Sequence, residues 1–325
     1  MQKKQLFLRS ALLFALSTSF GICNAAGTTD SAAATDWTAA ISSINQQNQS
    51  GFSSEMPPGA PPDGSTPPGP PPNGQGAPGQ QETQSADALS AVCTIDKTTK
   101  NIYQQTIAAT KSDENAVLVR NGGTLTMTDS ILKKTGDSSN TEDSNFTGRN
   151  AVLLVNNSQA TVSNTTLDSA AEGANALFST GKNSTITADH LKIHTTKGSS
   201  RGLDATYGGT ITASDIEITT EGAHCAALAT DRGEGTVTVT RGIFSTAGDG
   251  SPCIYSTGNI KAINSKGVST GSEIAVVEGK NSITLESTQL TGHTTHAPLP
   301  PHSPPPAAGT ATPSFTPKNS NLTNL

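Results

Sequence analysis

NAVLLVNNSQATVSNTTLDSAAEGANALFSTGKNSTITADHLKI, residues 150–193, contains one pattern twice. Each copy opens with Asn-Ala and an apolar residue, passes through a polar break, and continues as an alternating run rich in Thr and Ser. Alternation of apolar and polar residues at period two is typical of a β-strand with one buried face. The stretch therefore predicts two consecutive structural repeats, each built from short strands.

Seven copies of this pattern follow one another along the chain. Each joins a short apolar strand, such as NAVLV or CAALA, to a second strand, such as GTLTMTDSIL or GTVTVTRGIF. Their starting positions lie 21 to 35 residues apart, at 115, 150, 175, 201, 225, 252 and 273. A period of this length, with Gly, Asn and Ser turns and no helical run, is typical of a parallel β-helix. We predict an all-β solenoid of about seven rungs over residues 90–292.

The alternation also predicts which side chains face inward. In STITADHLKI, Ile186 should face the core while Thr185 and Thr187 face outward. Leu191 lies an odd number of residues beyond Ile186, so both can face inward only if a bend separates them near Asp189. The position of Ile186 should recur as one buried aliphatic ladder of Leu125, Val162, Ile211, Val237 and Ile283. Three asparagines that open successive copies are predicted to stack as a second ladder: Asn115, Asn150 and Asn175.

Residues 1–26 have the composition of a secretory signal peptide, with Lys3, Lys4 and Arg9 ahead of an apolar run and small residues at the cleavage position. Residues 27–89 are a polar segment with a Pro/Gly-rich tract at 51–83. That tract has too few apolar side chains to bury a core, so we predict a disordered linker. We expect the protein to be exported, and therefore secreted, periplasmic or at the cell surface.

Both ends of a β-helix need a cover, because an open strand edge can pair with another chain. Residues 90–114 alternate like strands, and we interpret them as the N-terminal cap. Residues 293–325 are rich in Pro, which cannot donate to a strand ladder, so we predict a disordered tail there and no further rung. Two interpretations stay open: a β-helix cut short before its C-terminal cap, and a natural flexible tail.

The charge balance bears on the partner. The chain has 20 Lys and Arg against 26 Asp and Glu, a formal net charge of −6, and no long basic run. A nucleic-acid partner requires clustered Lys and Arg, so we predict none. After residue 26 no stretch approaches the roughly 18 apolar residues that a membrane helix needs, so we predict no membrane span.

Two cysteines are candidates for a disulfide. Cys225 and Cys253 are about one repeat apart in the sequence, which favours a bond between neighbouring rungs. In the alignment of the copies they stand one position apart, which disfavours it. Two buried free thiols are the alternative.

The rungs from SDENAVLVRNGGTLTMTDS through GGTITASDIEITTEGAHCAALATDRGEGTVTVTRG resemble the adhesin-like, right-handed parallel β-helix proteins of bacteria, in the pectin-lyase-like group. The resemblance covers about residues 90–292. It implies a right-handed solenoid and a secreted or surface-exposed protein. The same fold hosts lyases, hydrolases and adhesins, so the resemblance does not by itself assign an activity.

Candidate catalytic residues come from two neighbouring rungs. Enzymes that cleave polysaccharides use paired carboxylates, or carboxylates that hold Ca²⁺ beside a basic residue. Asp204 and Asp231, with Arg201 and Arg232, could be rung neighbours on one face. The alternative is that they are ordinary solvated Asp and Arg side chains.

Two further groups are candidate metal ligands. Asp137, Glu142 and Asp143 lie on the long loop 133–149 and could hold Ca²⁺, although they lack a regular calcium-binding spacing. His190 and His194 would share one side of a strand but lie about 13 Å apart, too far for one ion. We therefore predict no metal site and no cofactor, with Ca²⁺ bound to the loop carboxylates as the alternative.

The recurring Thr-x-Thr on the second strand predicts a grid of outward hydroxyls and methyls, interrupted at NIKAI and NSITL. Such a grid is one way to bind ice, although Thr is also a common residue on an exposed strand. We favour an exported, non-catalytic adhesin-like or surface-display protein whose partner is a surface glycan or a host cell-surface ligand. A carbohydrate-active enzyme, either a polysaccharide lyase or a glycosidase, is the alternative, and an ice-binding protein is the third.

Overall fold

The structure, a computed structural model, describes residues 88–292 and 314–324. The predicted signal peptide and linker, and residues 293–313, lie outside the described residues and stay predictions.

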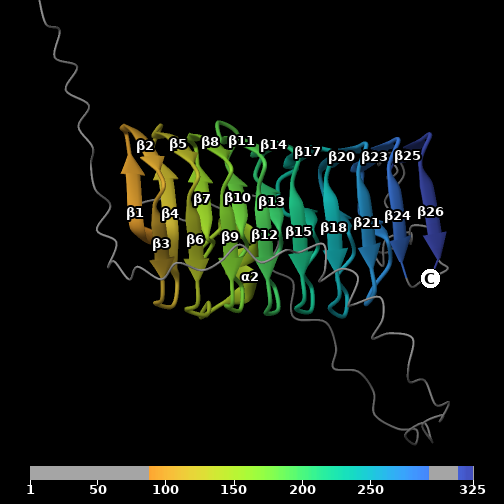
Figure 1. Cartoon of the computed structure of the whole chain (residues 1–325), viewed down its shortest axis with the longest axis horizontal. Coiled ribbons are helices and arrows are strands. Elements are labelled where there is room, and N and C mark those ends of the chain that lie inside the picture. The colour runs from red at the N-terminus through yellow and green to blue at the C-terminus, as the bar shows by residue number, and fades with distance from the viewer. Residues whose placement is uncertain (1–87, 293–313, 325) are drawn as a thin grey trace, which may run out of the picture. The chain divides into compact units, whose positions relative to one another are not determined.

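The described residues form a parallel β-helix in which the chain winds repeatedly through three sheets (Figure 1). Sheet A contains β1 (Ser90–Asp96), β4 (Glu114–Arg120), β7 (Leu153–Asn156), β10 (Leu177–Thr180), β13 (Leu203–Thr206), β16 (Leu228–Thr230), β19 (Ile254–Ser256) and β22 (Ala275–Val277). Sheet B contains β2 (Thr99–Tyr103), β5 (Thr124–Thr128), β8 (Gln159–Ser163), β11 (Thr185–Asp189), β14 (Thr210–Ser214), β17 (Thr236–Thr240), β20 (Asn259–Ile263), β23 (Ser282–Glu286) and β25 (Ser314–Lys318). Sheet C contains β3 (Thr106–Ala109), β6 (Ile131–Lys134), β9 (Thr166–Ser169), β12 (Lys192–Thr195), β15 (Glu217–Thr220), β18 (Ile243–Thr246), β21 (Lys266–Ser269), β24 (Gln289–Gly292) and β26 (Asn321–Asn324).

The β-helix has eight turns that contribute a strand to each sheet, one more than the seven copies found in the sequence. The additional turn is β1–β2–β3, which pairs in parallel with β4, β5 and β6. Residues 90–109 are therefore the first rung, and their interpretation as a separate cap is wrong. Their alternating pattern places Ile95, Ile102 and Ile107 in the core, which is why they join the stack.

The predicted aliphatic ladder is present, with one error. Val162 lies two residues past its predicted position and stacks between Met127 and Ala188. Ala160 takes the predicted place. In the alternating run QATVS both Ala160 and Val162 face inward, so the sequence alone offered two candidates for the ladder. The ladder is at most 4% exposed and runs through Leu125, Ala160, Ile186, Ile211, Val237, Ile260 and Ile283.

The bend predicted near Asp189 is confirmed at His190. One residue at each described corner between sheets B and C has a left-handed backbone conformation, with φ from 47° to 58°. It reverses the alternation, so that Ile186 and Leu191 both reach the core. Asn and Asp tolerate this conformation better than most residues, and several of them occupy the corner column of Gln104, Asp129, Asn164, His190, Asp215, Arg241, Asn264, Ser287 and Asn319.

Residues 314–324 fold back onto the stack, so the prediction of a disordered tail is wrong for this segment. β25 pairs with β23, and β26 pairs with β24. Pro317 lies in β25 opposite Leu285; since β25 is the edge strand of sheet B, its missing N–H interrupts no internal ladder. Phe315 packs against the core, and the two strands cover the last rung of sheets B and C. This contradicts the interpretation of a β-helix without a C-terminal cover.

We predict that Phe315→Ala destabilises the fold by about 1–3 kcal/mol, because it removes a partly buried ring from the end of the core. Urea unfolding followed by circular dichroism measures the change. Thr316→Ala, on the outward side of the same strand, is the matched control and should cost less than about 1 kcal/mol. Equal stabilities of Phe315→Ala and the unsubstituted protein would contradict the packing of β25 on the core.

Candidate functional site

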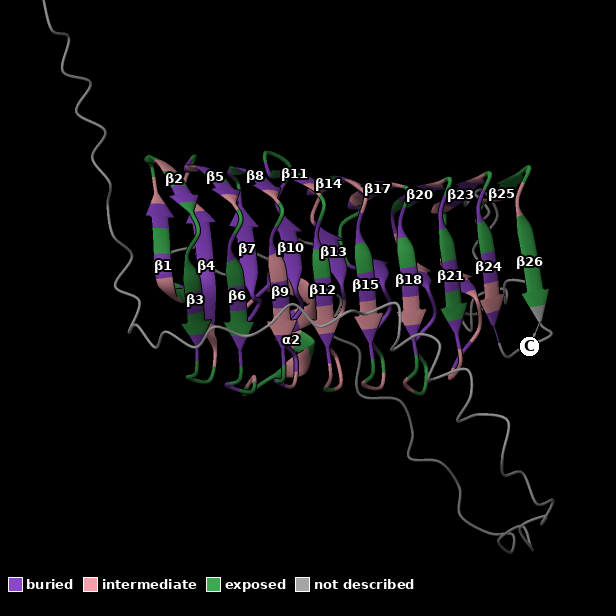
Figure 2. Ribbon diagram, in the orientation of Figure 1, coloured by how far each residue is buried: buried purple, intermediate pink, exposed green. Residues whose placement is uncertain are grey.

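The outer face of sheet A differs from the outer faces of the other two sheets. Its strands β4, β7, β10 and β13 are buried along their length, whereas the strands of sheet C alternate between buried and exposed residues (Figure 2). Inward residues such as Leu203 and Ala205 join the core. The outward residues stack in register as the column Leu118, Leu154, Phe178, Asp204, Ala229, Tyr255 and Val276. Its first three members are apolar and fully buried.

The long loop 133–149 covers this apolar part of the column. It contains α2 (Thr141–Thr147), which begins at the cap Asn140, whose side chain accepts a hydrogen bond from Asp143 N at 3.1 Å. The helix ends at Gly148, with φ 77°. A Cβ on Gly148 would lie 2.4 Å from Leu154 Cδ1 and 2.7 Å from Phe178 Cδ1. The end of α2 therefore lies directly on the outer face of sheet A, in a place that only glycine fits.

The three asparagines that were predicted to stack as a ladder instead hold this loop. Asn115 Nδ2 donates to Gly148 O at 2.9 Å, and Asn150 Nδ2 donates to Gly136 O at 3.0 Å. Asn175 Nδ2 donates to Ser144 O at 3.4 Å. The ladder fails because Asn150 is out of register: Leu153, three residues on, pairs with Val117, which is only two residues past Asn115.

α2 is also fixed to the rungs beside the loop. Thr206 Oγ1 donates to Phe146 O at 2.9 Å. The Arg232 guanidinium lies 3.9 Å from the centroid of the Phe146 ring and 3.5 Å from Glu142 Oε1. α2 therefore forms a wall at β13 and at the turn after β16, next to the point where the outer column changes from apolar to charged.

Arg201, Asp204 and Asp231 meet at that point. Arg201 precedes β13 and has its backbone N–H fixed by Asn175 Oδ1 at 2.8 Å. Its guanidinium nitrogens lie 2.9 Å from Asp231 Oδ2 and 3.8 Å from Asp204 Oδ2. The structure thus brings together three of the four residues that the sequence suggested as catalytic. Arg232 is not among them, because its side chain contacts α2.

The cluster is buried and incompletely paired. Asp204 is fully buried and Asp231 is 8% exposed. Neither carboxylate oxygen of Asp204 has a hydrogen-bond partner among the described residues, and the same holds for Arg201 Nη1. Unpaired buried polar groups cost folding free energy. Their presence in an otherwise well-packed column indicates a role other than stability.

Burial and Arg201 act on the two carboxyl groups unequally. Burial raises the pKa of Asp204 well above its usual range, and Arg201 only partly offsets this. Burial also raises the pKa of Asp231, against the nearer positive charge of Arg201. Burial lowers the pKa of Arg201, but Asp231 and Asp204 more than offset it and the pKa is raised. Asp204 is therefore the better candidate for the protonated member and Asp231 for the ionised one.

Tyr255 and Glu278 extend the cluster along the stack and were missed by sequence reasoning. Burial raises the pKa of the Tyr255 hydroxyl, and the negative charges of Glu278 and Asp231 raise it further. The hydroxyl also hydrogen-bonds Glu278. Tyr255 follows the inward Ile254, so its outward direction was available from the alternation. Glu278 comes after the end of β22, where the alternation no longer predicts direction.

The candidate calcium ligands of the loop do not converge. Asp137 pairs with Lys197 at 3.1 Å, Glu142 with Arg232 at 3.5 Å, and Asp143 with Arg149 at 3.1 Å. Each carboxylate is directed to a different cation because α2 places Glu142 and Asp143 in one turn and leaves Asp137 before it. The predicted Ca²⁺ site on this loop is not formed.

The candidate disulfide is not formed either, since Cys225 and Cys253 are both free and buried. Leu228 pairs with Ile254, which puts Cys253 opposite Ala227, two positions past Cys225. Cys225 takes a place between two serines: Ser200 N donates to its Sγ at 3.1 Å, and its own N–H donates to Ser251 Oγ at 2.9 Å. Burial raises the pKa of Cys225 to about 11 and that of Cys253 to about 12.

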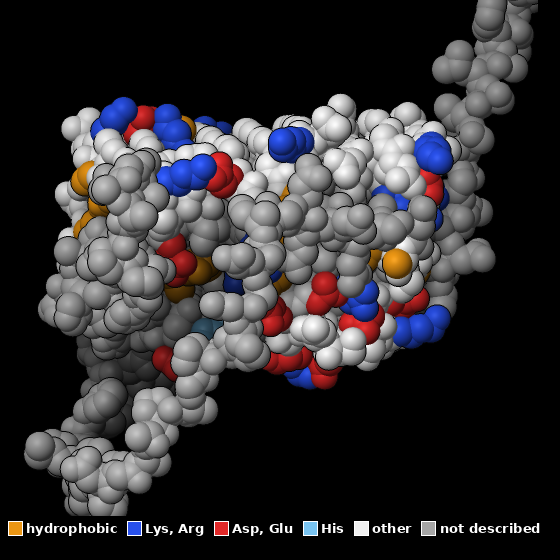
Figure 3. Space-filling view, turned by 180° about the vertical axis from the view of Figure 1, so that it is seen from behind, with side chains coloured by type: hydrophobic (Ala, Val, Ile, Leu, Met, Phe, Trp, Pro, Cys, Tyr) orange, Lys and Arg blue, Asp and Glu red, His pale blue; other side chains and the backbone are white. Residues whose placement is uncertain are grey.

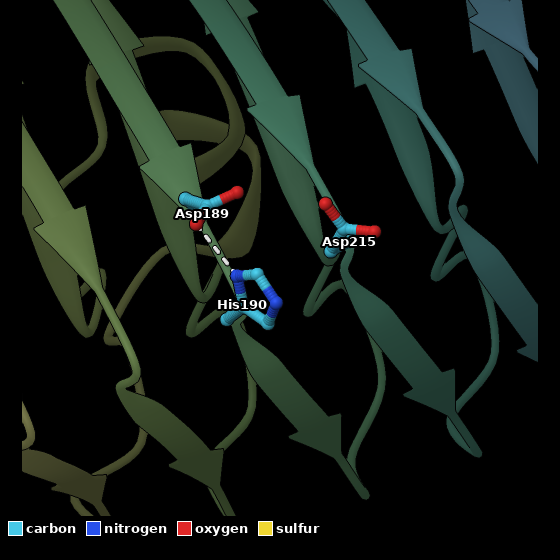
Figure 4. A group of neighbouring side chains, drawn as sticks. All are labelled: Asp189, His190 and Asp215. Carbon is cyan, nitrogen blue, oxygen red and sulfur yellow. Dashed lines mark hydrogen bonds and ion pairs between the residues drawn. The ribbon is translucent and has the colours of Figure 1, made fainter.

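A second charged group lies at the corner of sheets B and C, where Asp189, His190 and Asp215 have ligand atoms within 4.8 Å of one another (Figure 4). His190 Nδ1 lies 2.6 Å from Asp189 Oδ2, and the hydrogen bond that the imidazole donates to Asp189 raises the pKa of His190. Arg241 binds both oxygens of Asp215, at 2.6 and 2.5 Å. Protein cations already neutralise this group, so we interpret it as an ion-pair network of the corner column.

His194 is not part of that network and lies 2.8 Å from Glu221 Oε1. The two histidines do not share a strand, because β12 begins at Lys192 and His190 lies at the corner before it. On the side of the molecule seen in Figure 3, acidic and basic side chains are interspersed over the visible surface. Among the described residues no helix is long and apolar enough to cross a membrane.

Comparison of the chain with protein-family models, with curated proteins and with solved structures finds no match. The pectin-lyase-like and adhesin resemblance therefore rests on the repeat pattern alone, and the parallel β-helix itself on the structure.

Substitution of each aspartate by asparagine should change the stability of the protein by different amounts. Asp231→Asn should destabilise the protein by about 2–4 kcal/mol, because it leaves the buried Arg201 charge without its nearer partner. Asp204→Asn should cost less than about 1 kcal/mol, because the amide is uncharged like the protonated carboxyl that we assign to Asp204. Urea unfolding at pH 7 measures both, and equal costs would contradict the assignment of the proton to Asp204.

The pH dependence of the unfolding free energy tests the raised pKa of Asp204 independently. With its folded pKa raised, Asp204 holds more protons in the folded state, so its contribution lowers stability as pH rises above the unfolded value of about 3.9. Asp204→Asn should remove this part of the decline between pH 4 and neutrality, whereas Asp215→Asn at the exposed corner should not.

Proposed function

We propose that this protein is an exported carbohydrate-active protein that binds a glycan along the outer face of sheet A and hydrolyses it with Asp204 and Asp231. The observation that carries the proposal is the convergence of these two carboxyl groups and Arg201 from neighbouring rungs, with buried oxygens that lack hydrogen bonds. Paired carboxyl groups in unequal environments are what glycoside hydrolysis requires. Export is supported by the composition of residues 1–26.

The roles follow from the two environments. Asp204, kept protonated by burial, is the general acid that gives its proton to the leaving glycosidic oxygen as the C–O bond breaks. Asp231, whose carboxylate form is favoured by Arg201 at 2.9 Å, is the general base that takes a proton from the water attacking the anomeric carbon. One water is consumed, and proton exchange with solvent restores both groups. Arg201 is a positioning residue for Asp231.

The charges favour a neutral glycan over a polyuronate. Arg201 already faces two carboxyl groups, and Arg232 pairs with Glu142. Glu278 adds a further acidic group beside Tyr255. A uronate carboxylate would meet net negative charge here, and the loop carboxylates do not assemble a Ca²⁺ site that would bind it. These observations support hydrolysis rather than the lyase chemistry considered from the sequence.

Access requires a movement, because Asp204 is fully buried. α2 is the described element that reaches over β13. Thr206 and Arg232 hold it on that side, through Phe146 O and through Phe146 and Glu142. Asn115 and the packing of Gly148 on Leu154 and Phe178 anchor its C-terminal end to sheet A, so the movement that we infer is confined to the side facing β13 and the turn after β16. We infer that a glycan enters between α2 and the column that continues to Tyr255.

A non-catalytic adhesin-like surface protein is the second candidate. Its support is the regular β-helix with polar outer faces on sheets B and C, which offers a long surface for a glycan or cell-surface ligand without any chemistry. In that case the cluster around Arg201 binds the ligand and leaves it intact.

The test incubates the purified full chain with a panel of neutral and acidic polysaccharides, with Ca²⁺ or a chelator, and measures both pull-down onto insoluble glycans and new chain ends. We expect new reducing ends from a neutral glycan, independent of Ca²⁺. Asp204→Asn and Asp231→Asn should each lower the rate by about 10²–10⁴, while Asp215→Asn at the exposed corner should not. Unsaturated ends, or binding without cleavage, would overturn the hydrolase and in the second case favour the adhesin.

A further inference from the structure

Two columns of the outer face of sheet B form a regular array without charged residues from β5 to β17. From β5 to β17, five successive strands each present an outward residue at their first and third positions. Nine of these ten positions are threonine, and the tenth is Gln159. The threonines are Thr124, Thr126, Thr161, Thr185, Thr187, Thr210, Thr212, Thr236 and Thr238. All ten are at least partly exposed.

The register of these strands is unbroken. Thr126, Thr161, Thr187, Thr212 and Thr238 stand directly opposite one another from strand to strand. Neighbouring strands lie about 4.8 Å apart, and alternate residues of a strand lie roughly 6.7 Å apart. The side chains therefore form a rectangular lattice about 19 Å long, two columns wide, with no bulge to distort it.

The hydroxyl groups of this array are available to a ligand. None of the nine threonine side chains hydrogen-bonds another protein group in the described structure, in contrast to Thr128 in the third column, whose Oγ1 lies 3.0 Å from Ser163 Oγ. A β-branched side chain has few χ1 rotamers, so the hydroxyl and methyl positions are largely fixed before binding. A fixed array loses little conformational entropy when it meets an ordered surface.

The side chains of the threonine array indicate which kind of ordered surface it can bind. A crystalline polysaccharide is usually bound by aromatic platforms, and the array contains no aromatic residue. A charged mineral or lipid surface needs charged side chains, and the array has none; Lys261, in the next strand of the same column, pairs with Glu286 at 3.0 Å. Fixed hydroxyls alternating with methyls, repeated about every 4.8 Å across the strands and roughly every 6.7 Å along each strand, offer frozen water a regular array of hydrogen-bonding and apolar positions.

We propose that the threonine face of sheet B binds ice. The hydroxyls take positions of the ice lattice and the methyls fill the spaces between them, so that the adsorbed protein stops local crystal growth. The face lies on a different sheet from Asp204 and Asp231, so this inference does not depend on the proposed hydrolase. Lys261 interrupts the third-position column, which continues beyond it as Thr284 and Thr316.

The test measures thermal hysteresis and inhibition of ice recrystallisation with the purified full chain. We expect measurable hysteresis that Thr212→Lys abolishes, because a lysine at the centre of the array prevents flat contact. Thr219→Lys, on the outward side of β15 in sheet C, is the matched control and should leave hysteresis unchanged. Lys261→Thr should increase hysteresis by joining the two parts of the column.

Three results would overturn the proposal. The first is no thermal hysteresis beyond that of an inert protein at equal concentration, and the second is an equal loss of hysteresis in Thr212→Lys and Thr219→Lys. The third is self-association through this face, seen in sedimentation and abolished by Thr212→Lys, while ice growth is unaffected. Circular dichroism of each variant checks that the β-helix is intact, which is expected because both lysines replace outward side chains.

Discussion

In-register parallel stacking of equivalent strands is the constraint on which every other feature of this protein depends. Each strand of sheet B pairs residue for residue with the next, so a position that faces inward in one rung faces inward in all of them. One left-handed residue at each corner between sheets B and C, such as His190 in the fourth rung, keeps this true around the corner into sheet C. A slip of one residue would exchange the core and the surface of a whole strand.

The same register gives the outer faces different chemistry. On sheet B it aligns threonines into a lattice, while on sheet A it aligns apolar residues that α2 covers and then interrupts them with Asp204. Replacing a buried ion cluster by apolar residues is often neutral or stabilising in proteins. A column that already stacks Leu118, Leu154 and Phe178 had an apolar solution available, so the acidic pair and Arg201 are better explained by chemistry than by stability.

Much of this could be predicted from the sequence, because the repeat places equivalent residues at countable distances. The period, the inward Ile186, the bend and the approach of Asp204 to Asp231 all follow from it. The connections between strands limit this reasoning: their lengths vary, so Asn150 and Cys253 are shifted against their neighbours, and neither the asparagine ladder nor the disulfide forms. The fold-back of residues 314–324 was hidden by Pro317, which an edge strand tolerates. The cover by α2 depends on a loop whose conformation no periodicity specifies.

The central claim is that the outer face of sheet A holds a carboxyl pair in which Asp204 carries the proton. Carbon-13 NMR titration of the aspartate side chains tests it directly, with Asp204→Asn to assign the resonance. The account predicts that the Asp204 carboxyl titrates far above the usual value of about 3.9 and that Asp231→Asn shifts this titration. Titration of Asp204 near 3.9, unaffected by Asp231→Asn, would show two independent solvated carboxylates and contradict the site.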